Sequence, residues 1–154
     1  MSKVKRKLTT ILATDCVGFS KRMDENEELT LENLKACRSI IDPQIKEFGG
    51  RIFYTAGDSV IAEFDSPVEC VNAAIGFQKA INDRNNIIPP HSRLDWRVGI
   101  HLDDVIIEGD NVYGNRPIVR SPAYSPWAPE LDCIDIESYP VTSHNILDKL
   151  SIIF

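Results

Sequence analysis

Two aspartates in this sequence have the residue type and spacing of a metal-dependent site. Asp15 ends an apolar, β-rich run in the stretch "TILATDCVGFS", residues 10–20, and Asp58 lies between two β-rich runs in "IFYTAGDSVIAEF", residues 52–64. Carboxylates at strand ends and tight turns commonly serve only as turn residues, and that alternative stays open. If both runs lie in one sheet, however, the carboxylates project from the same edge. They would then offer hard oxygen ligands for Mg²⁺ or Mn²⁺ that bridges substrate phosphates.

The segment after Asp15 adds a second feature of such a site. Residues 17–20, "VGFS", form a glycine-containing turn that leads into a short predicted helix. Backbone N–H groups at the start of a helix bind phosphate. Two carboxylates beside this turn would suit a metal-bound nucleoside triphosphate.

Hydrophobic periodicity predicts the elements that position these residues. Residues 7–15 are typical of a buried strand, and residues 27–48 of a helix with one apolar face. The runs 51–55 and 60–64 predict a hairpin whose turn places Gly57 at a positive φ, directly before Asp58. The apolar face of the helix consists of residues spaced three or four apart: Leu34, Cys37, Ile41, Ile45 and Phe48.

A second helix is predicted over residues 67–85. Ser66 stands at its N-cap and Glu69 three residues beyond, which is the spacing of a capping box, and Pro67 occupies the first helical position. These residues indicate where the helix begins.

Two further strands are predicted at residues 94–102 and 104–109, joined at Asp103 and Asp104. The order is then β, α, α, β, β, α, β, β. Helices placed between hairpins and single strands predict an α+β sandwich with a mostly antiparallel sheet, rather than a doubly wound parallel one.

Composition excludes several classes of protein. The chain has 154 residues, 43% of them hydrophobic and 26% charged, as in an ordinary single globular domain. It contains no apolar run of about 18 residues, so we expect neither a membrane span nor a signal peptide, and a cytoplasmic location. The net charge of −6 disfavours nucleic-acid binding, and the basic residues 3–7, "KVKRK", are expected to form a solvated tail. The four cysteines lack a metal-ligand spacing and are interpreted as free thiols.

The chain changes character after Asn115. Residues 116–154 hold five of the nine prolines, and no helical or strand period persists there. Because proline removes a backbone donor and blocks helix formation, we expect an irregular tail over 116–154 after a domain that spans 1–115.

One long segment resembles the catalytic domain of bacterial class III nucleotidyl cyclases, the adenylate and guanylate cyclase family. The segment runs from "ILATDCVGFSKRMDENEE" through "GGRIFYTAGDSVIAEFDSPVE" to "WRVGIHLDDVIIEGDNVYGN". The resemblance runs from about Lys7 to Asn115. It implies a ferredoxin-like (βαβ-βαβ) sandwich, incomplete at its C-terminus, that works as a dimer with active sites between subunits.

The resemblance also implies roles for individual residues. Asp15 and Asp58 match the family's two metal-binding aspartates, with the backbone carbonyl of Cys16 as a third ligand for two Mg²⁺ or Mn²⁺ ions. The phosphate-binding turn would be formed by Val17, Gly18, Phe19 and Ser20. The implied reaction converts ATP into cyclic AMP and pyrophosphate by a two-metal displacement.

Other positions depart from the family pattern. Tyr54 and Asn111 stand where adenylate cyclases of the family have a base-reading Lys and Asp, so a preference for ATP or GTP stays open. Ile118 and Pro122 stand where the family has an Asn that orients the ribose and an Arg that stabilises the transferring phosphoryl group. No catalytic residue is therefore carried over from the family.

Three alternatives follow from this pattern. The chain is an active cyclase domain, working as a homodimer, or a non-catalytic module that binds metal nucleotide or pairs as a heterodimer with an intact cyclase chain. The third alternative is a gene remnant that folds poorly.

Overall fold

The computed structural model describes residues 5–114, and the predicted irregular tail at 116–154 lies outside them. Its elements follow the predicted order: β1 (Lys5–Cys16), α1 (Phe19–Glu25), α2 (Glu27–Glu47), β2 (Arg51–Ala56), β3 (Ser59–Phe64), α3 (Pro67–Ile87), a 3₁₀ turn (Pro90–Ser92), β4 (Trp96–Glu108) and β5 (Asn111–Gly114). None of the helices in this part of the chain is long and apolar enough to cross a membrane.

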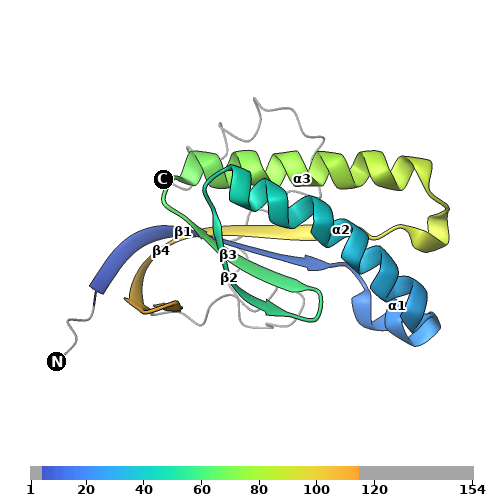
Figure 1. The fold of residues 1–154 in the computed structure, drawn as a ribbon, viewed down its shortest axis with the longest axis horizontal. Helices are drawn as coiled ribbons and strands as arrows, with labels where there is room; N and C mark the ends of the chain where they lie inside the picture. Colours follow the sequence, from blue (N-terminus) through green and yellow to red (C-terminus); the bar gives the residue numbers. More distant parts are fainter. Residues whose placement is uncertain (1–4, 115–154) are drawn as a thin grey trace.

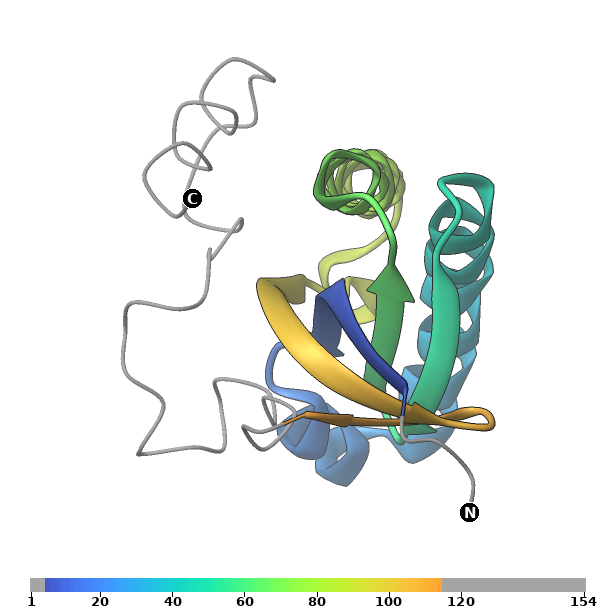
Figure 2. The ribbon, with the colours of Figure 1, turned by 90° about the vertical axis from the view of Figure 1, so that its left-hand side faces the viewer.

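The five strands form one sheet in the order β2-β3-β1-β4-β5, and every neighbouring pair is antiparallel. The long helices α2 and α3 lie together over one face of it (Figures 1 and 2). Strands β1 to β4 with these two helices have the ferredoxin-like arrangement, and β5 extends the sheet beside β4. The predicted α+β fold with an antiparallel sheet is confirmed.

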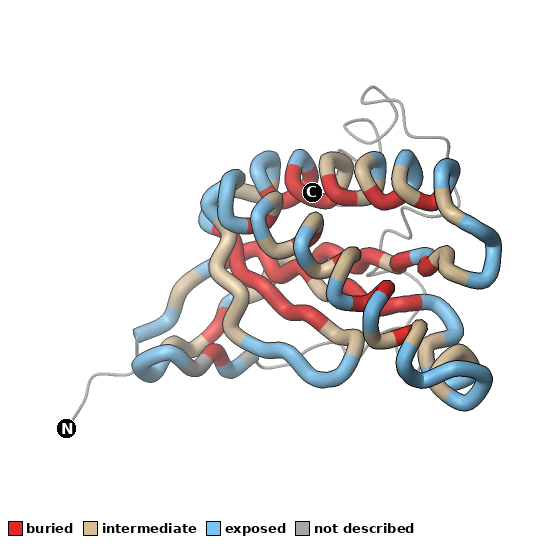
Figure 3. The backbone as a smooth tube through the Cα atoms, turned by 45° about the vertical axis from the view of Figure 1, so that its right-hand side comes forward, coloured by how far each residue is buried: buried red, intermediate tan, exposed pale blue. Residues whose placement is uncertain are grey.

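The main core lies between the helices and the sheet. Leu12 of β1, Ile41 of α2, Phe77 of α3 and Trp96 of β4 are almost fully buried there. Figure 3 shows the buried stretches running along the strands and the inner sides of both helices. The predicted apolar face of α2 is confirmed, since four of its five residues are buried and Phe48 packs against the same cluster.

The helix and turn signals in the sequence are also confirmed. The Ser66 hydroxyl accepts a hydrogen bond from the Glu69 N–H at 3.3 Å and caps α3. Gly57 has a φ of 56°, which glycine adopts without the steric cost that a Cβ would bring.

The predicted break at Asp103 and Asp104 is wrong, because β4 continues through both residues to Glu108. Strand β1 begins at Lys5 and pairs with β4 along its whole length, with Leu8 opposite Asp104. The ladder that β1 supplies outweighs the low strand propensity of two aspartates. The actual turn lies at Gly109, where φ is 61°.

The same ladder corrects the prediction of a solvated basic tail. Lys5, Arg6 and Lys7 belong to β1 rather than to a tail. Arg6 lies 3.6 Å from Asp104 on β4, and Lys7 pairs with Asp65 after β3. Part of the basic cluster therefore forms ion pairs across the sheet.

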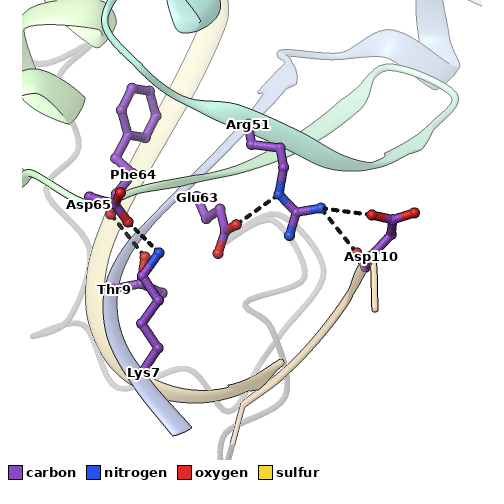
Figure 4. A network of polar contacts seen from close by, with 7 residues as sticks. All are labelled: Lys7, Thr9, Arg51, Glu63, Phe64, Asp65 and Asp110. Atoms are coloured by element: carbon purple, nitrogen blue, oxygen red, sulfur yellow. Dashed lines mark hydrogen bonds and ion pairs between the residues drawn. The ribbon is translucent and has the colours of Figure 1, made fainter. Parts of the chain in front are cut away.

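Arg51 shows how strongly the sheet curls. At the start of β2, Arg51 Nε donates to Glu63 Oε1 on β3 at 2.8 Å, and its Nη1 donates to the carbonyl oxygen of Asp110 at 3.3 Å (Figure 4). Asp110 lies in the turn between β4 and β5, so one side chain connects the two opposite edges of the strand order. We call this group, Arg51 with Glu63 and Asp110, the Arg51 clasp.

Candidate active site

The two predicted metal-ligand segments meet at the end of β1. Strands β1 and β3 pair with Thr14 opposite Val60, and continuing this register brings Asp58 opposite Cys16. Asp58 Oδ2 accepts a hydrogen bond from the Cys16 N–H at 2.9 Å. The turn that carries Asp58 is thus attached to the residue that follows Asp15.

Asp15 lies on the face of the sheet opposite the helices. Side chains alternate along a strand, so Asp15 shares its face with Ala13 and Ile11, whereas Leu12 and Cys16 point into the main core. The Asp15 side chain is only 6% exposed. A carboxylate buried to this extent needs a charged or hydrogen-bonding partner.

Arg97 supplies that partner, and sequence reasoning missed it. Arg97 Nε donates to Asp15 Oδ1 at 3.1 Å, and Arg97 Nη2 donates to Asp15 Oδ2 at 2.8 Å. The two residues lie directly opposite one another in the β1–β4 ladder. The sequence signal that could have identified Arg97 is the antiparallel pairing of the two strands. This pairing brings the first residues of β4 beside the last residues of β1.

Electrostatics link Asp58 to this pair. Burial raises the pKa of the Asp58 carboxyl, with a smaller upward contribution from the negative charge of Asp15, while the Cys16 N–H and the Arg97 guanidinium act to lower it. The charges of Asp15 and Arg97 therefore both act on the Asp58 carboxyl, in opposite directions. Two carboxylates whose charges repel one another form a site that a cation stabilises.

This donor set fits a hard divalent ion. Residues 5–114 contain no cluster of three or more His, Cys, Asp or Glu side chains able to hold a metal. Two neighbouring carboxylates with few other protein ligands match Mg²⁺ or Mn²⁺, which retain water and substrate oxygens in their coordination shells.

The Cys16 thiol takes no part in such a site. Its side chain points into the main core, its Sγ donates to the Val17 carbonyl oxygen at 3.6 Å, and burial raises its pKa to about 12. Because the thiol stays protonated at neutral pH, a role for Cys16 as a ligand is limited to its backbone.

The predicted phosphate-binding turn has a defined geometry. Val17 N–H already donates to the Asp95 carbonyl oxygen at 2.8 Å, so this group is engaged within the protein. Gly18 adopts a left-handed conformation with φ 65°, and α1 begins at Phe19. Phe19 Cε1 lies 4.0 Å from the position that a Cβ on Gly57 would take. The start of α1 therefore lies beside the turn that carries Asp58.

The strands that carry Tyr54 and Asn111 both contribute residues to a second apolar cluster, on the face of the sheet opposite the helices. Tyr54 is 52% exposed and pairs in register with Ile61, which packs in this cluster with Val112, the residue after Asn111. The Arg51 clasp joins the same two segments through Asp110. The structure therefore brings the two segments that carry the predicted base contacts to one face of the sheet.

Two curated relatives are similar to this chain. The "Putative adenylate cyclase 3" of Rhizobium meliloti (strain 1021) is 34% identical over 113 residues, which make up 73% of this chain and 19% of the relative. The "Serine/threonine-protein kinase pkn2" of Myxococcus xanthus is 30% identical over 114 residues, 73% of this chain and 14% of that protein. The chain thus spans less than a fifth of the length of either relative. No protein-family model matches the sequence.

A solved structure shares both sequence and fold with the described residues. The crystal structure of an adenylate/guanylate cyclase/hydrolase from Silicibacter pomeroyi is 34% identical, with a TM-score of 0.67. The match covers 73% of this chain and 66% of that one. With its ferredoxin-like sheet and this similarity in sequence, the chain belongs to the class III adenylate/guanylate cyclase family.

Proposed function

We propose that this chain binds a divalent-metal complex of a nucleoside triphosphate and converts ATP into cyclic AMP and pyrophosphate. The observation that carries the proposal is the meeting of Asp15 and Asp58 at one end of the sheet, fastened by the hydrogen bond from Cys16 N–H to Asp58 Oδ2 at 2.9 Å. Family membership supports the choice of substrate class.

Asp15 and Asp58, with the Cys16 carbonyl, would hold Mg²⁺ or Mn²⁺. Bound there, the ions would supply Lewis-acid polarisation of the phosphoryl oxygens and favour ionisation of the attacking hydroxyl. In the proposed reaction the ribose 3′-oxygen bonds to the α-phosphorus, the bond from that phosphorus to the bridging oxygen breaks, and pyrophosphate leaves. The 3′-hydroxyl proton passes to water.

The remaining site residues have positioning roles in this proposal. The N–H groups of the turn over Val17, Gly18, Phe19 and Ser20 would contact phosphate, except that of Val17, which Asp95 occupies. Tyr54 would stack on or hydrogen-bond to the purine, together with Asn111. A neutral pair of this kind favours neither ATP nor GTP by charge.

A non-catalytic role is the second candidate. It is favoured by Ile118 and Pro122, which stand where the family carries its Asn and Arg. A chain that retains the metal aspartates but lacks these groups would bind metal nucleotide without turnover. It would complete a site in a heterodimer, in which an intact cyclase chain supplies the Asn and Arg.

The test is conversion of ATP, and separately of GTP, to cyclic nucleotide by the purified chain with Mn²⁺. Asp58→Asn is the decisive variant, because an amide oxygen can still accept the Cys16 N–H while it loses the charge that binds metal. Asp83→Asn is the matched control, since Asp83 is exposed on α3.

Turnover by the wild type and by Asp83→Asn, lost in Asp58→Asn, would support the proposal. Absence of turnover in a folded homodimer would contradict it. Metal-dependent ATP binding without turnover, or turnover that appears only on mixing with an intact cyclase chain, would establish the non-catalytic role.

A further inference from the structure

The side chains of Asp15 and Arg97 make the most complete ion pair at the candidate site. The guanidinium contacts both carboxylate oxygens, at 3.1 and 2.8 Å, while the side chains are 6% and 25% exposed. Two parallel N–H to oxygen bonds give such a pair both strength and a fixed geometry. The pair is therefore a built feature of the sheet rather than a surface contact.

The β1–β4 ladder holds this pair in place. Asp15 and Arg97 are register partners, and the Thr14 hydroxyl donates to the Arg97 carbonyl oxygen at 2.7 Å. Both backbones are thus held close together at the point where the side chains meet.

The two-pronged contact has a consequence for any cation that binds the same carboxylate. Each Asp15 carboxylate oxygen already accepts a hydrogen bond from an N–H group of Arg97. A divalent ion coordinated by Asp15 would compete for these oxygens and would repel the nearby positive guanidinium. Arg97 and the ion therefore compete for the carboxylate oxygens of Asp15.

We propose that Arg97 is the exchangeable counter-ion of Asp15, a positioning residue that holds the carboxylate until a divalent ion binds and then releases it. This inference rests on the proposed metal-binding role of Asp15 and Asp58. Arg97 itself ligates no metal in this scheme. Its part is to keep a buried carboxylate oriented and paired while the site awaits its ion.

The release can be observed directly by NMR. In ¹⁵N-labelled protein, the Arg97 Nε–Hε resonance is assigned by its loss in Arg97→Lys and followed during titration with Mg²⁺. The Cys16 amide, which bonds Asp58, reports binding at the same site independently. We expect both signals to change with one midpoint, and the Arg97 signal to lose its protection from solvent exchange.

Metal affinity gives a second readout. Arg97→Lys keeps the positive charge but loses the two-pronged contact, so we expect Mg²⁺ and Mn²⁺ to bind about 5- to 10-fold more tightly than to the wild type. Arg38→Lys is the matched control, because Arg38 makes the same two-pronged contact with Asp42 on α2, at 2.7 and 2.8 Å, away from the site. General damage to the fold would weaken binding instead of strengthening it.

The outcomes separate this inference from the proposed function. Metal binding that needs Asp58 but is unchanged or weakened in Arg97→Lys overturns the inference and leaves the metal site standing. A protected Arg97 signal that persists at saturating Mg²⁺ does the same. Failure of the wild type and of Arg97→Lys to bind either metal overturns both.

Discussion

The Asp58 carboxylate accepts a hydrogen bond from the backbone N–H of Cys16, at 2.9 Å, across 42 residues of sequence. This bond attaches the tip of the β2–β3 hairpin to the end of β1. It also sets the spacing between the two aspartates, because Cys16 directly follows Asp15. The geometry of the candidate metal site therefore depends in part on one backbone donor and one side-chain acceptor.

Removing that acceptor should destabilise the protein. In Asp58→Ala the part-buried Cys16 N–H loses its partner, and we expect the free energy of unfolding to fall by about 1–2 kcal/mol. Asp58→Asn retains an oxygen at the same place and should not show this loss. Urea denaturation of the two variants with EDTA present measures the difference. Equal stability of both variants would contradict a structural role for this bond.

The raised pKa of Asp58 predicts a pH dependence of stability. Between the ordinary carboxyl value of 3.8 and the higher folded value, the folded chain binds more protons than the unfolded chain. Stability then falls as pH rises through this window and stays lowered above it. Asp58→Asn does not titrate, so the wild type should lose stability relative to Asp58→Asn as the pH rises from below 3.8. Denaturation curves across this range, with EDTA, would refute the prediction if the wild type instead gains.

The Arg51 clasp should stabilise the folded sheet. Glu63 is buried and its Oε1 bonds Arg51, so Arg51→Met leaves a buried carboxylate without this partner. Because the Arg51 side chain is 40% exposed and partly screened, we expect a loss of roughly 1–3 kcal/mol. The double variant Arg51→Met with Glu63→Met should recover much of it in thermal and urea unfolding. No recovery would mean that the contact to Asp110, and not the charge on Glu63, dominates.

Two glycines near α2 should respond to alanine in opposite directions. A methyl group at Gly50 would lie 2.5 Å from Phe64 Cζ and 2.7 Å from Ile45 Cγ2, inside the core, so Gly50→Ala should cost about 1–3 kcal/mol. At Gly76 the close neighbour is the amide tip of Gln44, which can rotate away. Since Gly76 lies within α3, Gly76→Ala should be neutral or add up to about 1 kcal/mol. Comparing the denaturation midpoints of the two variants decides whether the core around Gly50 is as tight as described.

The sequence alone determined the features that depend on neighbours along the chain. Apolar spacing located α2, the Ser66 cap located the start of α3, and Gly57 identified the tight turn before Asp58. These signals act within one helical turn or one hairpin, so they can be read without knowing the partner strands. The two candidate metal-binding aspartates and the family resemblance were also evident from the linear order of residues.

Tertiary structure decided the features that depend on partners distant in sequence. Asp103 and Asp104 were expected to break a strand, but the ladder from β1 carries β4 through them. Arg97 meets Asp15 across 82 residues, and Arg51 reaches Asp110 across 59. Strand register and sheet curl set these contacts, and both result from the packing of the whole sheet rather than from local propensity. The sequence alone therefore named the two carboxylates, and only the folded sheet supplied the cation that holds one of them.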